Sequence, residues 1–155
     1  MSSTEPLAGL AYEISPDQQR LDLNAIHAYL TRSYWSPGIP LEVVKRAVRN
    51  SLCFGVYESV SGAQVGFARV VTDYATFAYL CDVYVLEEHR GHGLGKRMMR
   101  EVMAHPALTG ARRAMLATRD AHGLYAQEGF VVAGAAGNLM EIVRPDIYSR
   151  PMSAI

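Results

Sequence analysis

The stretch that most constrains the fold of this chain runs from Leu80 to Arg100. It begins with a mostly apolar run, Leu80–Leu86, whose β-branched and aromatic residues predict a largely buried strand. A turn rich in glycine, Glu87–Gly95, comes next. From Leu94 onward the apolar residues recur on one face at helical spacing, which predicts a helix. A strand, a glycine turn and a helix start therefore follow one another directly.

The junction between this turn and the helix suits an anion. The first amides of a helix have no partner within it, and the helix dipole places roughly half a positive charge there. Glycine has no Cβ, so its backbone can approach a ligand closely. A phosphate or pyrophosphate is the expected ligand, with two cations beside the glycines. The residues expected to hold it are Arg90, Gly91, His92, Gly93, Leu94, Gly95 and Lys96.

Two common phosphate-binding motifs do not fit the spacing. A P-loop has four residues between its glycines, then Gly-Lys-Ser/Thr. Here three residues separate Gly91 from Gly95, and Lys96 is followed by Arg97. The dinucleotide pattern Gly-x-Gly-x-x-Gly fails in both registers, because its third glycine would fall on Lys96 or Met98. Neither kind of nucleotide site is therefore expected.

The turn does match a third pattern, Arg/Gln-x-x-Gly-x-Gly/Ala, over residues 90–95. Here the chain resembles the GNAT superfamily of acyl-CoA-dependent N-acyltransferases. In that family the turn holds the coenzyme A pyrophosphate, and the preceding strand hydrogen-bonds the pantetheine arm. The resemblance implies that Val83, Tyr84 and Val85 bind acetyl-CoA and that backbone N–H groups there stabilise an oxyanion where the strand ladder opens. The alternative is a helix start whose glycines serve tight packing alone.

A second motif, Leu-Tyr-x-x-x-Gly-Phe, lies at residues 124–130. It resembles the short fourth helix of the family and its exit, where a tyrosine faces the coenzyme sulfur and protonates the leaving thiolate. The resemblance makes Tyr125 the candidate acid; the alternative is a core aromatic. Full proton transfer from a tyrosine of pKa near ~10 to a thiolate of pKa near ~8.5 is uphill by roughly 2 kcal/mol. We therefore expect Tyr125 either to hydrogen-bond the departing sulfur or to have a lowered pKa.

The chain departs from the family at one position near this motif. Many members have an asparagine seven residues before the tyrosine, where its side chain contacts the pantetheine. Thr118 stands there in this sequence, with Asp120 close by. The departure affects that side-chain contact and leaves the expected backbone site intact.

A general base is also expected, because an alkylammonium with a pKa near ~10 must lose a proton before it attacks a thioester. Asp82 is the first candidate, since it lies within an apolar strand beside the expected carbonyl site, where burial disfavours a charged carboxylate. Asp73 is the second candidate and His122 the third. Other roles stay open: Asp82 can pair with Arg69, Asp73 can cap a turn, His122 can face solvent, and a water chain can replace a dedicated base.

In the family, the loop between the first two helices covers the acceptor pocket. Tyr34, Trp35 and Ile39 lie in that loop here. Aromatic residues at such a place can clamp an apolar or cationic group, although Trp35 can equally pack onto the core. Tyr34, Trp35 and Asp73 are the expected acceptor-binding residues. A small amine, an amino-acid derivative and a peptide N-terminus or lysine all remain possible acceptors.

The whole chain has 155 residues, of which 50% are hydrophobic and 19% charged, as is typical of one globular domain. We expect a single domain over residues 1–155, with its core at about 10–144 and a tail at 145–155. The formal net charge is zero, so no long-range attraction to nucleic acid or to an anionic membrane is expected. No apolar run approaches the ~20 residues of a membrane span.

The location and the metal content are predicted from the same composition. Met1–Gly9 lacks the pattern of a secretion signal. The two cysteines, Cys53 and Cys81, lie in apolar runs and indicate buried thiols in a reducing, cytoplasmic compartment. The histidines show no metal-ligand spacing, so no metal is expected.

Periodicity along the chain predicts the order β-α-α-β-β-β-α-β-α-β-β, a mixed α/β fold. The resemblance implies a GNAT-like, mostly antiparallel central sheet flanked by about four helices. Strands are expected at 11–14, 52–58, 64–71, 77–86, 114–118, 130–132 and 139–143. Helices are expected at 21–32, 40–50, 93–105 and 120–128.

The sequence therefore predicts an N-acetyltransferase that moves an acetyl group from acetyl-CoA directly to a primary amine of an unidentified acceptor. One alternative is a non-catalytic acyl-CoA-binding or regulatory module, against which Tyr125 argues. Another is a binding protein for a different nucleotide, against which the motif spacing argues. The oligomeric state stays open, a homodimer included.

Overall fold

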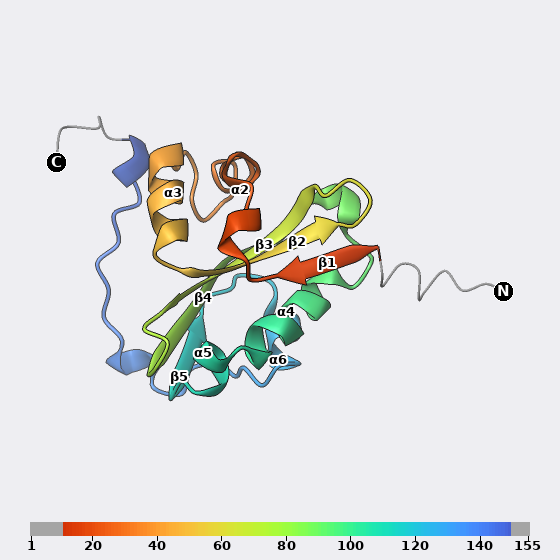
Figure 1. Ribbon diagram of the computed structural model, residues 1–155. Helices are drawn as coiled ribbons and strands as arrows, with labels where there is room; N and C mark the ends of the chain where they lie inside the picture. Colours follow the sequence, from red (N-terminus) through yellow and green to blue (C-terminus); the bar gives the residue numbers. More distant parts are fainter. Residues whose placement is uncertain (1–10, 150–155) are drawn as a thin grey trace.

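The computed structural model describes residues 11–149, and its central feature is a five-stranded sheet of order β1-β2-β3-β4-β5 (Figure 1). Neighbouring strands from β1 to β4 are antiparallel, and β5 runs parallel to β4. The fold is thus mixed α/β with a mostly antiparallel sheet, which confirms the prediction. The strands are Tyr12–Ser15 (β1), Leu52–Glu58 (β2), Gln64–Thr72 (β3), Phe77–Val85 (β4) and Arg113–Leu116 (β5).

Helices lie on both sides of this sheet, with α2 and α3 on one side and α4, α5 and α6 on the other (Figure 1). Each side has its own cluster of buried apolar side chains, so the sheet is buried between two cores. None of the helices between residues 11 and 149 has the length and apolar character needed to cross a membrane. The α-helices are Leu23–Leu30 (α2), Leu41–Arg49 (α3), Leu94–Ala104 (α4), Pro106–Thr109 (α5) and His122–Ala126 (α6). Short 3-10 helices are Gln18–Arg20 (η1), Glu87–His89 (η2), Ala136–Asn138 (η3) and Ile147–Ser149 (η4).

The helix α5 was not predicted from the sequence. Pro106 follows the end of α4 and begins a new helix, because a proline suits the first helical turn, where its missing N–H is not needed. His105 stabilises this start, since its Nδ1 accepts a hydrogen bond from the backbone N–H of Ala107 at 3.0 Å.

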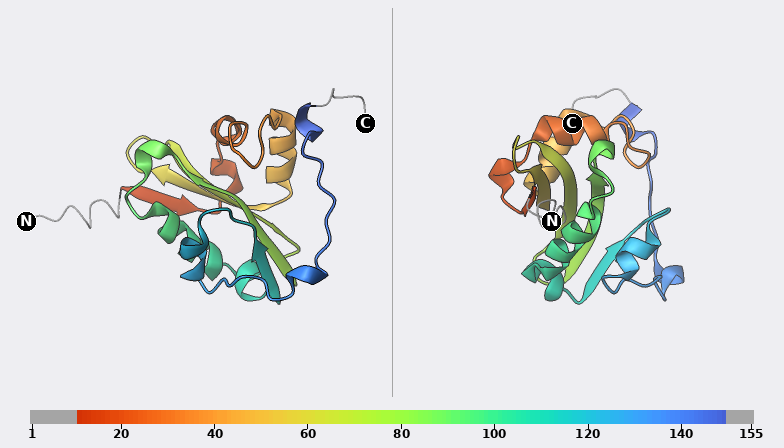
Figure 2. Two further views of the ribbon diagram at one scale, coloured as in Figure 1. Left: turned by 180° about the vertical axis from the view of Figure 1, so that it is seen from behind. Right: turned by 90° about the vertical axis from the view of Figure 1, so that its right-hand side faces the viewer.

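The predicted closing pair of strands at residues 130–132 and 139–143 is wrong. Within the described part of the chain, neither segment pairs with a strand. Residues 130–149, the C-terminal arm, instead run from α6 past β5 and along the outside of the molecule to α3 (Figure 2). A strand forms only where a neighbour bonds its N–H and C=O groups, and among residues 11–149 the arm has no such neighbour. At the far end of the arm, Tyr148 packs against the cluster between the sheet and helices α2 and α3.

The limits of the predicted domain fall partly outside the described residues. Residues 1–10 and 150–155 are not described, so the expected tail is seen only as far as residue 149.

The sheet opens at the middle of β4. Pairing between β4 and β5 ends at Leu80, opposite Leu116, while β4 continues to Val85. The β3–β4 ladder also changes register there, so that two β4 residues, Asp82 and Val83, face one β3 residue. Asp82 has a φ of 55°, a left-handed conformation that is uncommon for a residue with a side chain and costs roughly 1–3 kcal/mol. This bulge places an acidic side chain beside the opening between β4 and β5.

Candidate active site

The start of α4 leaves its first amides without a capping side chain. Gly93 is the N-cap residue and has a φ of 72°, and Gly91 has a φ of 88°, both in the region that favours glycine. No side chain caps the helix, and nothing lies within 4 Å of the place that a Cβ would take on either glycine. The space in front of these amides is therefore free. A pyrophosphate, such as that of coenzyme A, fits this arrangement.

The two cations of the turn are placed differently. The guanidinium of Arg90 is bound to the protein, because its Nε donates to the carbonyl oxygen of Val85 at 2.9 Å and an Nη donates to the hydroxyl of Tyr29 at 3.1 Å. Lys96 is exposed and forms no ion pair with any residue between 11 and 149. Arg90 thus joins the turn to β4 and α2, and Lys96 is the cation that can reach an anion freely.

The other side chains of the turn hold it in place. The ring of His92 lies 5.8 Å from that of Tyr12 on β1, and Leu94 is buried in the core beneath the helix. A Cβ on Gly95 would lie 3.8 Å from Leu124, an ordinary contact distance. The binding that the sequence predicts for these residues would therefore be made by their backbone, and it stays a prediction.

The backbone of β4 presents alternate residues to the opening. The N–H of Leu86 donates to the carbonyl of Val65 at 2.8 Å, so it points toward β3. Because backbone groups alternate along a strand, those of Tyr84 also point toward β3, whereas those of Val83 and Val85 point away from it. Val83 and Val85 therefore turn their backbone groups toward the open edge, where the carbonyl oxygen of Val85 accepts the bond from Arg90 and the N–H groups have no strand partner among residues 11–149.

Tyr84 does not share this edge. Its ring is buried and stacks on that of Tyr29, with 3.9 Å between the ring centroids and 5° between the planes. Burial raises the pKa of the Tyr84 phenol, so the group stays neutral. The structure therefore places Tyr84, predicted to bind the cofactor, in the core behind the open edge.

The carboxylate of Asp82 is held at both oxygens. Trp35 Nε1 donates to Oδ1 at 2.8 Å, and Arg69 Nε donates to Oδ2 at 2.7 Å. Arg69 also donates through Nη1 to Ser51 Oγ at 3.1 Å. The side chain of Asp82 is 8% exposed and that of Arg69 is 19% exposed, so this is a largely buried ion pair. The pairing with Arg69 that the sequence left open is thus present, and a proton accepted by Asp82 would compete with both donors.

We predict that Asp82→Asn lowers the free energy of unfolding by about 3 kcal/mol, because it leaves the buried charge of Arg69 without a counter-charge. Asparagine tolerates positive φ, so the bulge itself is expected to persist. Urea unfolding followed by circular dichroism measures the change. The control is Glu42→Gln, which breaks the exposed pair with Lys45 and is expected to cost about 0.5 kcal/mol or less. If both variants lost the same small amount of unfolding free energy, the ion pair between Asp82 and Arg69 would have no structural role.

The loop between α2 and α3 connects the two sides of the opening. On the β4 side, Trp35 bonds Asp82 and its ring lies 6.3 Å from that of Tyr29. On the other side, the guanidinium of Arg119, in the loop after β5, lies 3.7 Å from the ring centroid of Tyr34. Trp35 keeps 38% of its surface exposed, so it is not a core residue. Both aromatic side chains border the opening, and their contact with an acceptor stays a prediction.

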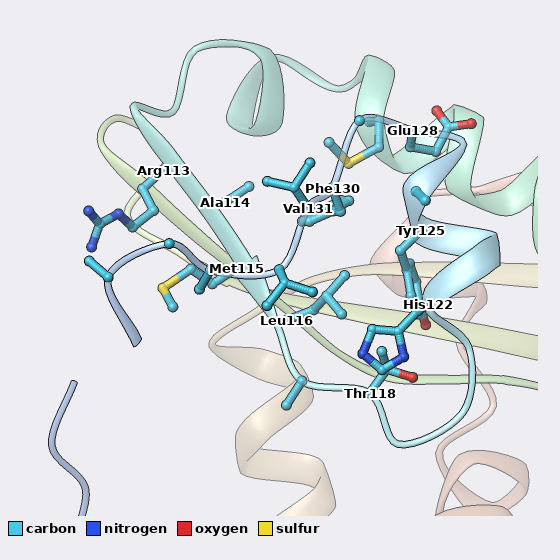
Figure 3. Close-up of a pocket in the computed structure, with 18 of the residues that line it drawn as sticks. Arg113, Ala114, Met115, Leu116, Thr118, His122, Tyr125, Glu128, Phe130 and Val131 are labelled. Atoms are coloured by element: carbon cyan, nitrogen blue, oxygen red, sulfur yellow. The ribbon is translucent and has the colours of Figure 1, made fainter. Parts of the chain in front are cut away.

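Helix α6 brings Tyr125 to the same region. Tyr125 is buried, and Figure 3 shows it extending from α6 together with His122 toward the loop that holds Thr118. The hydroxyl of Thr118 accepts a hydrogen bond from the backbone N–H of Ala121 at 3.0 Å. Thr118, which stands where the family resemblance implies an asparagine, therefore fixes the start of α6.

The surroundings of Tyr125 keep its phenol protonated. Burial raises its pKa, and the nearby Tyr34 and Asp120 raise it further. A lowered pKa, one of the two expectations for Tyr125, is therefore wrong in this structure. The remaining expectation is a hydrogen bond donated by the phenol to a departing sulfur.

A pocket of about 840 Å³ lies beside Tyr125 (Figure 3). Its polar end is formed by Thr118, His122 and Tyr125. Its apolar part extends along β5 to the C-terminal arm, and the larger apolar side chains there are Met103, Met115, Leu116, Phe130, Val131 and Leu139.

Asp73 is not brought to this region. It lies in the β3–β4 turn, at the end of β4 opposite to the opening, and its Oδ1 accepts hydrogen bonds from the backbone N–H groups of Ala75, Thr76 and Phe77. The Thr76 hydroxyl donates to Oδ2 at 2.6 Å. The bonds from Thr76, then those from the other amides, hold the pKa of Asp73 well below its usual range. Asp73 therefore caps a turn, and the structure does not support its expected roles as a base or an acceptor ligand.

Two contacts at the site could not be predicted from the sequence, that of Arg119 with Tyr34 and that of Trp35 with Asp82. Arg119 lies in an irregular loop, and nothing in its surroundings predicts the contact with Tyr34. The bond between Trp35 and Asp82 joins residues far apart in the chain and depends on the bulge in β4. In residues 11–149, no group of three His, Cys, Asp or Glu side chains could hold a metal ion.

Comparison with known proteins agrees with this geometry. A family model described as an acetyltransferase (GNAT) domain matches residues 49–132, more than half of the chain. The chain belongs to the GNAT acetyltransferase family. The matched residues include the opening of the sheet, the glycine turn and Tyr125, so the family assignment and the candidate site rest on the same part of the chain.

Individual relatives give the same family. A Gibberella zeae protein named "Putative acetyltransferase FG08082" is 36% identical over 135 residues, covering 74% of this chain and 75% of that protein. A crystal structure of a GNAT-family protein from Xanthomonas campestris pv. campestris is 52% identical with a TM-score of 0.85, covering 90% of this chain and 97% of that chain. A Clostridium acetobutylicum protein described as a "predicted acetyltransferase with acetyl-CoA" shares the fold at 14% identity. Its TM-score is 0.61, and the match covers 85% of this chain and 94% of that chain.

Proposed function

We propose that this GNAT protein is an acetyl-CoA-dependent N-acetyltransferase that moves the acetyl group directly to a primary amine. The observation that carries the proposal is the open edge of β4, which lies between the uncapped start of α4 and the region of Tyr125. Family membership supports acetyl transfer, and the Clostridium acetobutylicum neighbour with acetyl-CoA supports the donor.

The backbone would hold most of the donor. The first amides of α4, after Gly91 and Gly93, would bind the pyrophosphate together with the ammonium of Lys96. The N–H groups of Val83 and Val85 would bond the pantetheine arm and the acetyl carbonyl. When bound, acetyl-CoA supplies an acetyl thioester, whose leaving group is a thiolate.

The side chains around the opening would orient the two reactants. Tyr125 would donate a hydrogen bond to the sulfur, with its raised pKa keeping the proton on the phenol. The exposed faces of Tyr34 and Trp35 would contact the acceptor. Because both oxygens of Asp82 are engaged, we propose that it positions Trp35 and that water accepts the proton of the amine.

Two measurements test the proposal. Calorimetry with acetyl-CoA, coenzyme A, ATP and NAD is expected to show binding of the first two alone. Thiol release measured over a panel of amines, amino-acid derivatives and peptides is expected to identify the acceptor class. Binding of ATP or NAD without coenzyme A would contradict the donor. Tight binding of acetyl-CoA with no thiol release for any amine would favour a non-catalytic acyl-CoA-binding module.

Below about pH 10, we expect no decrease in kcat/KM that is caused by ionisation of Tyr125. Burial disfavours the tyrosinate, so the pKa of Tyr125 moves upward and the proton is retained to higher pH. Activity should instead rise with pH, as more of the acceptor amine becomes neutral. Rates measured between about pH 6 and 10 give the profile. A falling limb below about pH 9 that disappears in Tyr125→Phe would contradict this expectation.

A further inference from the structure

Arg119, in the loop after β5, is held against the α2–α3 loop by a single ring contact. Its guanidinium carbon lies 3.7 Å from the ring centroid of Tyr34, so the cation lies over the ring. A guanidinium in this position is attracted by the negative face of the ring. Arg119 is exposed, but this contact gives its side chain a defined place beside the opening.

The charge of Arg119 is not compensated within the described part of the chain. Among residues 11–149, Arg119 forms no ion pair and its guanidinium donates no hydrogen bond. Asp120, the next residue, is exposed too and is not paired with it. A guanidinium carries its N–H donors around the rim of one plane, and a ring over its face leaves these donors available. The rim of Arg119 can therefore bind a ligand.

Other cations of the site are engaged or lie elsewhere. Arg69 is paired with Asp82, and Arg90 donates to a backbone carbonyl and to a tyrosine hydroxyl. Lys96 has no ion pair among residues 11–149, but it belongs to α4, on the side of the sheet away from α2 and α3 (Figure 1). Because Arg69 already neutralises Asp82, the charge of Arg119 stands uncompensated on the side of the α2–α3 loop.

The contact partner of Arg119 lies beside the candidate acid. The ring of Tyr34 meets that of Trp35 edge-on, with 5.0 Å between the centroids and 84° between the planes. Burial raises the pKa of Tyr125, and Tyr34 raises it further, which places the two phenols near each other. A ligand at the rim of Arg119 would therefore lie next to the two aromatic rings and within reach of the reaction centre.

We propose that Arg119 binds a carboxylate of the acceptor, so that the substrates are small amines that carry a carboxylate, as free amino acids do. The planar fork of a guanidinium matches the two oxygens of a carboxylate, and charge-assisted hydrogen bonds fix both its position and its orientation. The partly exposed rings of Tyr34 and Trp35 contact the carbon skeleton of the same molecule, and its amine points to the open edge of β4. This inference rests on the proposed N-acetyltransferase function and selects among the acceptors that the sequence leaves open.

Matched pairs of acceptors test the carboxylate. Thiol release is measured with free amino acids and with the corresponding amides, which lack the carboxylate. For each amino acid that is acetylated, we expect a kcat/KM at least about 10-fold above that of its amide. The reactivity of the amines alone would favour the amide, because its amine is less basic and a larger fraction of it is neutral at a given pH. Ethanolamine phosphate and ethanolamine form a further pair, and a larger preference for the phosphate than for the carboxylate would overturn the proposal.

Variants of Arg119 connect this preference to the residue. Arg119→Gln is expected to raise the KM of the amino acid at least about 10-fold, while the affinity for acetyl-CoA measured by calorimetry and the rates with the amides change little. Arg119→Lys keeps the charge but loses the fork, so its KM is expected to lie between those of the wild type and Arg119→Gln. The control is Arg112→Gln, which should have the KM of the wild type. Arg112 is also exposed and forms no ion pair among residues 11–149, but it precedes β5, at the end of that strand away from the opening.

The outcomes separate this inference from the proposed function. Equal thiol release with acids and amides, or a KM that Arg119→Gln leaves unchanged, would overturn the carboxylate site and leave N-acetyl transfer in place. Faster release with peptide N-termini than with free amino acids would do the same. Binding of acetyl-CoA with no thiol release for any amine would overturn the proposed function and this inference with it.

Discussion

Gly93→Val is expected to lower the affinity for acetyl-CoA at least about 100-fold, measured by calorimetry. The Cβ position of Gly93 lies in free space in front of the first amides of α4, so an isopropyl group would occupy the approach of the pyrophosphate. A hydrogen bond to a charged group contributes about 1.5–3 kcal/mol, so losing two such bonds accounts for the expected effect. The same change should leave the buried face of α4 intact, because that face is formed by other residues, including Met98 and Val102.

The control for Gly93→Val is Gly62→Val. Gly62 has a φ of 75°, close to that of Gly93, and it also has nothing within 4 Å of its Cβ position. Both substitutions therefore place a β-branched residue in the left-handed region, with a similar cost in stability. Gly62 lies in the β2–β3 turn, so its variant should bind acetyl-CoA normally. Equal affinities of the two variants for acetyl-CoA would show that the pyrophosphate does not bind at the turn before α4.

The parts of the fold that the sequence predicted well are those determined by local chemistry. The start of α4 follows from a glycine turn and an apolar stripe that lie within a few residues of each other. Strand β2 was predicted at its observed limits, Leu52–Glu58, because its apolar run is bounded by the end of α3 and by a glycine turn. Tyr125 was found through a motif whose members lie within a single helix and its exit.

The features that were missed depend on residues far apart in the chain. The apolar residues of the arm have the pattern of strands, but pattern alone does not show whether a neighbouring strand is available. The indole of Trp35 reaches Asp82 only because a bulge in β4 turns that carboxylate toward the α2–α3 loop. The same bond changes the interpretation of Asp82, since a carboxylate predicted as a free base is engaged by two donors.

Tyr125→Phe is expected to lower kcat about 100-fold, while the affinity for acetyl-CoA measured by calorimetry changes little. The phenol would contribute mainly when the sulfur leaves, so its loss should affect the transition state more than the bound ground state. The control is Tyr57→Phe, which makes the same chemical change in a buried ring of β2, outside the site. The hydroxyl of Tyr57 has no hydrogen-bond partner among the described residues, so its removal should alter neither kcat nor stability appreciably. If Tyr125→Phe turned over as fast as Tyr57→Phe, Tyr125 would be a core aromatic, and no hydrogen bond from its phenol would assist the departing sulfur.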